Sequence, residues 1–142
     1  MSRKIAILGA GAIGSCVGAD FTQAGHDVVL IDQWPAHVEA MKDRGLYIKV
    51  ANEERQIPVK AFHLCELAAW QPQFDVVFLT VKSNDTCWMV EFIKPYLKPD
   101  GVLVSLQNSL NDEWIAPIIG HHRDVGSVVE LSAEIFEPAR VK

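Results

Sequence analysis

Short apolar runs alternate with amphipathic stretches along most of the chain. Continuous apolar runs, which are typical of strands buried on both faces, predict strands at 5–8, 28–31, 75–81, 102–106 and 125–131. Helix formers and apolar residues at helical spacing predict helices at 12–24, 35–44, 64–70, 84–96 and 112–119. Strands that alternate with helices predict an α/β fold: a Rossmann-like, doubly wound, mainly parallel sheet in three αβα layers. We expect residues 1–142 to form one such domain.

Two segments depart from this alternation. Residues 46–50 and 57–59 predict two short strands or a hairpin-like excursion, separated by the polar residues 52–56. Residues 133–141 alternate weakly around Glu137-Pro138, as a hairpin does. Pro95 is expected to kink or fray the last turn of the helix at 84–96, and Pro99-Asp100-Gly101 predicts a turn before the next strand.

The first predicted strand runs directly into Gly9, Gly11 and Gly14 in G-x-G-x-x-G register. In dinucleotide-binding folds the first glycine allows a tight turn, the second lets a pyrophosphate approach the backbone, and the third lets the helix pack against the strand. The pyrophosphate then lies at the helix N-terminus, where unpaired N–H groups stabilise an anion. Gly25 is placed to end that helix, and Asp32 follows the second strand, 18 residues beyond Gly14. Together these features predict a dinucleotide-binding turn.

The same stretch also has a rival interpretation. Arg3-Lys4 followed by mostly apolar or small residues superficially resembles a secretory signal peptide. Against it stand the glycines at 9, 11, 14 and 18, each of which would weaken an apolar helix by roughly 1 kcal/mol relative to alanine. The glycine register and Asp32 would also be coincidental, so the dinucleotide interpretation is favoured.

Composition agrees with a soluble globular domain, because 49% of the residues are hydrophobic and 22% are charged. A net charge of -5 argues against nucleic acid or an anionic membrane surface as partner. Cys16, Cys65 and Cys87 are odd in number and far apart, which predicts reduced thiols in a cytoplasmic protein. Each lies in an apolar stretch, so we expect all three to be buried.

Polar residues follow two of the predicted buried strands directly. Lys82, with Ser83 and Asn84, follows the strand at 75–81, and Asn108, between Gln107 and Ser109, follows the strand at 102–106. Doubly wound sheets bind their ligands beyond the carboxyl ends of the strands. Lys82 and Asn108 are therefore candidate ligand contacts; the structural alternatives are a solvated strand end for Lys82 and a turn residue for Asn108.

Other candidate chemistry is weak. His121-His122 lacks cysteines or carboxylates at ligand spacing, so no metal site is expected, and His37 and His63 are isolated. The H-E-x-x-H, P-loop and G-x-S-x-G motifs do not occur in the sequence. The four tryptophans most simply fill the core or an interface.

Three motifs in this order resemble the N-terminal domain of the ketopantoate reductase (2-dehydropantoate 2-reductase) family. They are GAGAIG at residues 9–14, Thr80-Val81-Lys82-Ser83 and Leu106-Gln107-Asn108, and the resemblance extends over essentially the whole chain. Two departures stand out, because Ser109 and Ala139 occupy positions where the family usually has glycine. By resemblance, Lys82 and Asn108 line the nicotinamide end of the site and position cofactor and substrate.

The resemblance implies hydride transfer from NAD(P)H to a small 2-keto acid in pantothenate biosynthesis. It also implies a helical C-terminal domain that supplies a general-acid lysine and much of the substrate pocket, and that lies outside these 142 residues. We therefore expect this chain to bind cofactor but to reduce little or no keto acid alone, with a homodimer left open. The expected cofactor-binding residues are Gly9, Ala10, Gly11, Ala12, Ile13, Gly14, Asp32, Val81, Lys82 and Asn108.

The sequence around Asp32 and the resemblance to the family favour different cofactors. Asp32 is placed to accept hydrogen bonds from a ribose 2′-hydroxyl and to repel a 2′-phosphate, which favours NAD(H), whereas the family as usually described uses NADPH. No arginine or lysine adjoins Asp32, since Gln33 and Trp34 follow it. Two other functions stay open: the N-terminal domain of another two-domain NAD(P)-dependent dehydrogenase, and a non-catalytic NAD(P)-sensing module.

Overall fold

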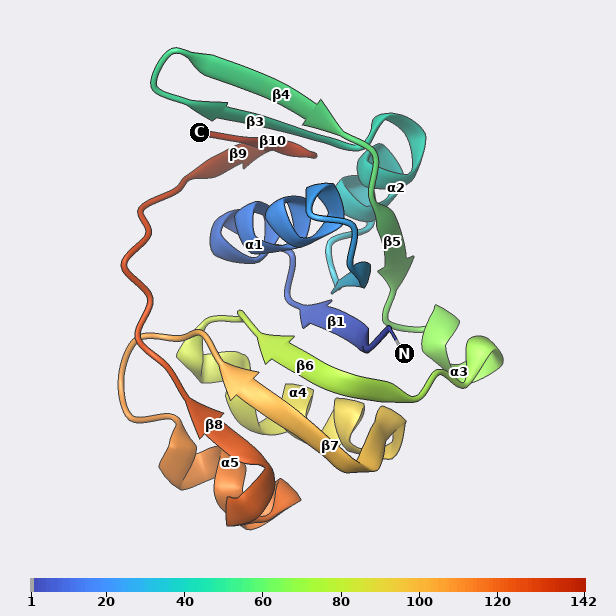
Figure 1. The fold of residues 1–142 in the computed structure, drawn as a ribbon, viewed down its shortest axis with the longest axis vertical. Helices are drawn as coiled ribbons and strands as arrows, with labels where there is room; N and C mark the ends of the chain where they lie inside the picture. The colour runs from blue at the N-terminus through green and yellow to red at the C-terminus, as the bar shows by residue number, and fades with distance from the viewer. Residues whose placement is uncertain (1) are drawn as a thin grey trace.

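A parallel sheet of six strands forms the centre of the computed structural model, which describes residues 2–142 (Figure 1). The strand order is β5-β2-β1-β6-β7-β8. The strands are β1 (Lys4–Leu8), β2 (Asp27–Asp32), β5 (Lys60–His63), β6 (Phe74–Leu79), β7 (Leu97–Ser105) and β8 (Asp124–Gly126). All neighbouring pairs are parallel, and the chain proceeds outward in opposite directions on the two sides of β1. The predicted doubly wound Rossmann-like fold is confirmed, and its switch point lies at β1.

Helices cover both faces of this sheet. Side chains on β1 alternate: Ala6 and Leu8 belong to one buried apolar cluster, and Ile7 belongs to the other. The first cluster is completed by α3 (Glu66–Trp70), α4 (Thr86–Ile93) and α5 (Asp112–Ile119). The second is completed by α1 (Ala12–Gln23) and α2 (Pro35–Arg44). Burial on both faces explains why the central strands read as continuous apolar runs.

A second, smaller sheet lies beyond α1, which is sandwiched between the two sheets (Figure 1). Its strands are β3 (Leu46–Val50), β4 (Glu53–Ile57), β9 (Ile135–Glu137) and β10 (Arg140–Val141), in the order β4-β3-β10-β9. β9 and β10 form the predicted C-terminal hairpin, and β10 pairs in parallel with β3 so that Arg140 faces Tyr47. This pairing fixes residues far apart in the sequence next to each other.

Several predicted boundaries are wrong. Residues 52–56, expected to separate two strands, lie mainly in β4, whose polar side chains are exposed except for the half-buried Arg55. β4 pairs with β3 as an antiparallel hairpin, and the strand expected at 57–59 is replaced by β5. The strand expected at 125–131 ends at Gly126, and residues 127–134 have no regular structure. In place of the turn expected at 99–101, β7 begins at Leu97, and its register with β6 shifts between Phe74 and Val76.

The helix expected at 84–96 is divided into shorter pieces. A 3₁₀ turn, η1 (Ser83–Asp85), precedes α4, and another, η2 (Lys94–Tyr96), follows it. Pro95 lies in η2, so the last turn of the expected helix departs from α-helical geometry at the proline, where a kink or fraying was predicted. A third 3₁₀ turn, η3 (His121–Arg123), connects α5 to β8.

The predicted burial of some side chains is also wrong. Cys16 is buried, whereas Cys65 and Cys87 are exposed, and all three are free thiols. Trp34, Trp88 and Trp114 are 39%, 42% and 52% exposed, so they lie outside the core, and their expected place at an interface stays a prediction. Within residues 2–142, none of the helices has the length and apolar character needed to cross a bilayer.

Candidate functional site

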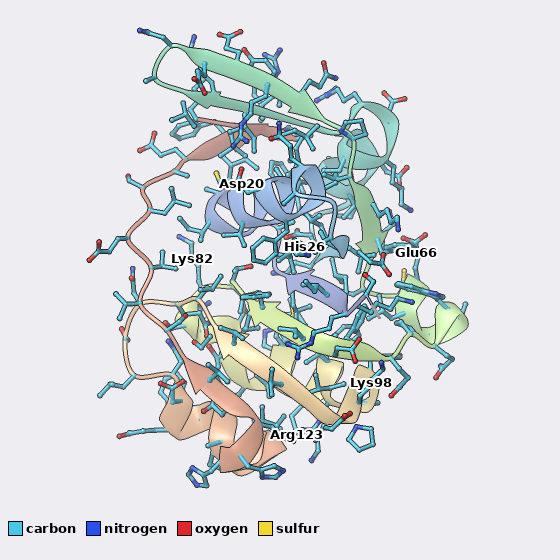
Figure 2. All side chains as sticks on the ribbon, viewed as in Figure 1. Asp20, His26, Glu66, Lys82, Lys98 and Arg123 are labelled. Atoms are coloured by element: carbon cyan, nitrogen blue, oxygen red, sulfur yellow. The ribbon has the colours of Figure 1, made fainter. Side chains whose placement is uncertain are left out.

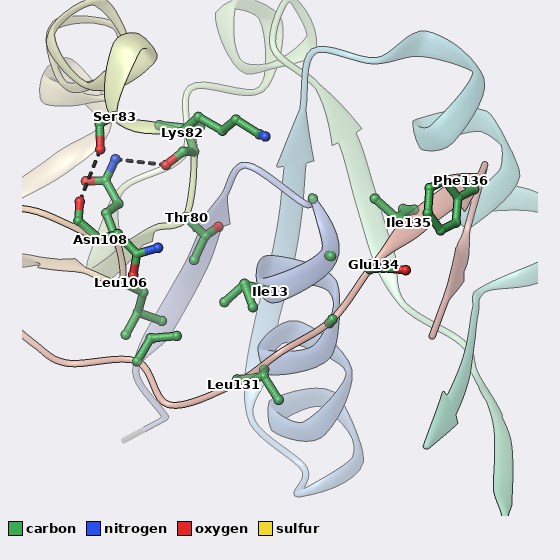
Figure 3. A pocket seen from close by; sticks show the side chains of 16 residues that line it. Ile13, Thr80, Lys82, Ser83, Leu106, Asn108, Leu131, Glu134, Ile135 and Phe136 are labelled. Atoms are coloured by element: carbon green, nitrogen blue, oxygen red, sulfur yellow. Dashed lines mark hydrogen bonds between the residues drawn. The ribbon is translucent and has the colours of Figure 1, made fainter. Parts of the chain in front are cut away.

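A cavity of about 760 Å³ opens at the carboxyl ends of β1, β6 and β7 (Figure 3). Four segments line it: the turn after β1, the loop after β6, the loop after β7, and residues 129–136. The lining residues are Gly11, Ala12, Ile13, Thr80, Val81, Lys82, Ser83, Leu106, Gln107, Asn108, Val129, Leu131, Ala133, Glu134, Ile135 and Phe136. Its position next to the switch point is the one that this fold uses for ligands.

The three motif glycines occupy different environments. Gly9 has a φ of +98°, and a Cβ there would lie 2.6 Å from Cγ1 of Val81. A Cβ at Gly14 would overlap the carbonyl oxygen of Gly9 and lie 2.5 Å from Oγ1 of Thr80. A Cβ at Gly11, in contrast, would meet no other atom within 4 Å, so this glycine leaves open space on the cavity side. The turn thus has two glycines required by the fold and one that leaves room for a ligand.

The N-terminus of α1 opens into the cavity. Gly11 is its N-cap and provides no side-chain cap, and the first turn carries no acidic residue. The first intrahelical bond runs from the Ser15 N–H to the Gly11 carbonyl oxygen, at 2.8 Å, so the N–H groups of residues 12–14 have no acceptor within the helix. Gly11, Ala12 and Ile13 line the cavity. Free donors and the positive end of the helix dipole make this wall suited to an anion.

The end of β6 is tied to the glycine turn by Thr80. Its N–H donates to the Leu8 carbonyl oxygen at 3.0 Å, and its hydroxyl donates to the carbonyl oxygens of Leu8 and Gly9. These hydrogen bonds fix the chain just before Lys82. Figure 2 shows Lys82 in the space between α1 and β6, and Figure 3 shows its side chain extending into the cavity. The site therefore has a cation opposite the α1 N-terminus.

Asn108 contributes the other predicted polar contact. It lies in the loop after β7, is exposed, and lines the same cavity as Lys82. The Leu106 N–H donates to the Leu79 carbonyl oxygen at 2.9 Å, so the two strand ends stay paired up to the point where their loops diverge. Ser109, one of the two residues expected to replace a family glycine, has a φ of +77°. The structure thus brings Lys82 and Asn108 together, as their positions at strand ends predict.

Asp32 lies apart from these residues. It ends β2, is 9% exposed, and is not among the residues that line the cavity. Its Oδ1 accepts a hydrogen bond from the Trp34 N–H at 2.8 Å, which stabilises the turn that leads into α2. Ala10, also predicted to bind cofactor, is fully buried beneath the turn.

His37, which looked isolated in the sequence, occupies a central position below the glycine turn. It is 1% exposed, its Nε2 donates to the Ala10 carbonyl oxygen at 2.6 Å, and its Nδ1 accepts from the Ala139 N–H at 2.8 Å. Ser15 Oγ donates to the same Ala10 carbonyl at 2.8 Å. Burial lowers the pKa of His37, which keeps the ring neutral, as this donor and acceptor pattern requires. No sequence spacing signals a link between Ala10 and Ala139, because it depends on the pairing of β10 with β3.

The wall formed by residues 129–136, which is mostly apolar but includes Glu134, was also missed. Val129, Leu131 and Phe136 line the cavity from a segment that approaches it only because β9 and β10 join the second sheet. Within residues 2–142 there is no group of three His, Cys, Asp or Glu side chains placed to hold a metal ion.

Comparison with known proteins agrees with this arrangement. The sequence model described as "Ketopantoate reductase PanE/ApbA" matches residues 5–142. The chain belongs to the ketopantoate reductase family. It is 37% identical over 140 residues to a 2-dehydropantoate 2-reductase of Pyrococcus horikoshii, covering 98% of this chain and 44% of that protein.

Two solved structures have a fold similar to that of this chain. The crystal structure of 2-dehydropantoate 2-reductase from Geobacter metallireducens is 31% identical, with a TM-score of 0.87, over 97% of this chain and 45% of that one. The ternary structure of D-mandelate dehydrogenase with NADH and anilino(oxo)acetate is 28% identical, with a TM-score of 0.89, over 97% of this chain and 44% of that one. The chain spans less than half the length of these relatives.

Proposed function

We propose that this chain is the nicotinamide-dinucleotide-binding part of a 2-keto acid reductase that resembles 2-dehydropantoate 2-reductase. The observation that carries the proposal is that one cavity combines the open face of Gly11, the uncapped N-terminus of α1, Lys82 and Asn108. Family membership supports the reaction class.

In this proposal each wall of the cavity has a separate task. The N–H groups at the start of α1 bind the pyrophosphate, which approaches the backbone over Gly11 because no side chain fills that space. The Lys82 ammonium offers charge and three donors, and the Asn108 amide offers both donors and an acceptor, to orient the nicotinamide and the substrate. The bound nicotinamide supplies the hydride that reduces the keto carbon.

Asp32 leads us to propose NAD(H) as the preferred cofactor. Its Oδ1 is occupied by the Trp34 N–H, so Oδ2 is the atom that would accept the ribose 2′-hydroxyl. A carboxylate there repels a 2′-phosphate, and Gln33 and Trp34 offer no compensating charge. The D-mandelate dehydrogenase with a similar fold has a ternary structure with NADH, which also supports this choice.

Isothermal titration calorimetry with NADH and NADPH tests both parts of this proposal. We expect NADH to bind more tightly than NADPH, and Asp32→Asn to weaken NADH binding by about 10- to 100-fold, as expected for loss of a hydrogen bond to a charged group. Glu53→Gln is a matched control, because it removes an exposed carboxylate on β4 and should leave both affinities unchanged. Tighter binding of NADPH by the wild-type chain would contradict the role of Asp32, and no binding of either nucleotide would refute the function.

The substrate and the location follow from the family and are proposed on that basis. We propose a small 2-keto acid as substrate and a cytoplasmic protein, with turnover dependent on residues outside this chain. Addition of 2-dehydropantoate to the NADH-bound chain should therefore leave the absorbance of NADH at 340 nm nearly constant. Rapid oxidation of NADH would show that residues 1–142 suffice for catalysis.

A further inference from the structure

A buried asparagine, Asn111, joins the two loops that supply Lys82 and Asn108. It is 2% exposed. Its Nδ2 donates to the Asn108 carbonyl oxygen at 2.7 Å and to Ser83 Oγ at 3.3 Å, and its Oδ1 accepts from Thr86 Oγ1 at 3.2 Å. Both polar atoms of the Asn111 side chain therefore form hydrogen bonds, to Asn108 in the loop after β7 and to Ser83 and Thr86 in the segment after β6.

Two neighbouring residues extend the same network. Gln107 Nε2 donates to the Val81 carbonyl oxygen and to Thr86 Oγ1, each at 2.9 Å. Ser83 Oγ donates to the Asn108 carbonyl oxygen at 3.1 Å, a bond drawn in Figure 3. The Asn108 carbonyl thus accepts two hydrogen bonds, from Ser83 and from Asn111, which fix the peptide that carries the Asn108 side chain.

Asn111 forgoes another role to make these contacts. It is the N-cap residue of α5, where asparagine ordinarily caps the helix and contributes about 1 kcal/mol. Its side chain makes no capping hydrogen bond here and turns toward Asn108 and Thr86 instead. A residue placed only to start α5 would cap it, so the inward side chain points to a different task.

Little else holds the loop that carries Asn108. Ser109 has a φ of +77°, in the left-handed region that is unfavourable for residues other than glycine, and Leu110 is 76% exposed. Apolar packing therefore contributes little to the position of residues 108–110, and the hydrogen bonds from Asn111 and Ser83 provide the restraint.

We propose that Asn111 is a positioning residue that holds Asn108 in its binding orientation and couples it to the loop of Lys82. This inference rests on the proposed function, because Asn108 must contact the dinucleotide for its orientation to matter. The expected consequence is that Asn111 affects nucleotide affinity only through Asn108.

A double-mutant cycle on NADH affinity, measured by calorimetry, tests this coupling. We expect Asn111→Ala and Asn108→Ala each to weaken NADH binding about 10-fold. Asn108→Ala removes the side chain that contacts the dinucleotide, and Asn111→Ala removes the hydrogen bond that fixes the Asn108 peptide before the nucleotide binds. The double variant should bind about as weakly as either single variant. Asn84→Ala, which changes an exposed asparagine in the same region, is the matched control and should bind like the wild type.

Ser83→Ala provides a second route if Asn111→Ala does not fold. It removes the other donor to the Asn108 carbonyl from a partly exposed position, and should weaken NADH binding several-fold in the wild-type background and not at all in Asn108→Ala. Losses that multiply in the double variants, or an unchanged affinity in Asn111→Ala, would overturn the inference while leaving the proposed function intact. A wild-type chain that binds no NADH would overturn both.

Discussion

Gly14 offers the sharpest test of how the glycine turn is built, because its surroundings are backbone atoms and a fixed hydroxyl. In Gly14→Ala the new Cβ would overlap the Gly9 carbonyl oxygen and lie 2.5 Å from Thr80 Oγ1. Thr80 cannot rotate away without breaking its hydrogen bonds to the carbonyl oxygens of Leu8 and Gly9. The first turn of α1 would have to move away from β1 and β6.

The magnitude follows from two opposing effects. Overpacking of a rigid site costs about 1–3 kcal/mol, and the backbone contact at Gly14 places it near the upper end of that range. Alanine in a helix recovers up to about 1 kcal/mol relative to glycine. The free energy of unfolding should therefore fall by about 2 kcal/mol, which for a chain of this size corresponds to a fall in Tm of about 8 °C.

Urea unfolding followed by circular dichroism measures this change, with Gly11→Ala as the matched control. The Cβ at Gly11 meets no other atom within 4 Å, so that variant should lose only about 0.5 kcal/mol, the preference for glycine over alanine at an N-cap. If Gly14→Ala were as stable as the wild type, or more stable than Gly11→Ala, the close packing of α1 against the turn would be refuted.

Further predictions concern pH and backbone strain. Burial lowers the pKa of His37 below 6.5, so the unfolded chain binds more protons and the free energy of unfolding should fall as the pH drops below 6.5. His37→Gln should flatten that slope in urea titrations, and an unchanged slope would contradict the buried neutral ring. Burial and the neighbouring Asp112 carboxylate raise the pKa of Asp124 to about 6. At Asp124 it is therefore the folded chain that binds more protons, and the free energy of unfolding falls as the pH rises through 6. Asp124→Asn should therefore raise the free energy of unfolding by about 1 kcal/mol at pH 7.5, after allowance for solvent screening, and change it little at pH 4. Equal effects at both pH values would exclude the repulsion between Asp112 and Asp124 as the cause. Ser109→Gly should relieve its positive φ and raise stability by up to about 1 kcal/mol, whereas a lower Tm would mean that the serine is not strained.

Local signals in the sequence were sufficient for much of the central fold. α2 begins at Pro35 and ends before Gly45, as predicted, because proline suits the first turn of a helix and glycine adopts the positive φ at its end. The buried strands β1, β2 and β6 were predicted because both of their faces are covered, which makes their side chains apolar throughout. The glycine turn was predicted because its requirements are local.

The failures occur where the pattern of apolar and polar residues does not report strand pairing or burial. The hairpin-like excursion expected near residues 46–59 is formed by β3 and β4, but the position of β4 was predicted wrongly because its mostly polar residues carry no strand pattern and its pairing with β3 supplies the order. Val128 belongs to an apolar stretch predicted to be a strand, yet it is 88% exposed and follows the end of β8. Apolar character alone does not distinguish a buried strand from an exposed apolar segment.

Some residues of the candidate site could likewise be predicted from the sequence, and others could not. Lys82 and Asn108 could be predicted because strand ends in a parallel sheet share one edge. His37, Asn111 and the wall at residues 129–136 could not, since each depends on side-chain direction or on the joining of β10 to β3. An asparagine before α5 reads as an ordinary N-cap in any sequence.

The central claim is that a dinucleotide binds with its pyrophosphate at the glycine turn, beside Lys82 and Asn108. Titration of ¹⁵N-labelled protein with NADH, followed by amide chemical shifts, tests it most directly. The account predicts the largest shifts at Gly11, Ala12, Ile13 and Asn108, with the amides of β4 unmoved. Saturating NADH that leaves the glycine-turn amides unchanged, or that mainly shifts amides elsewhere, would contradict it.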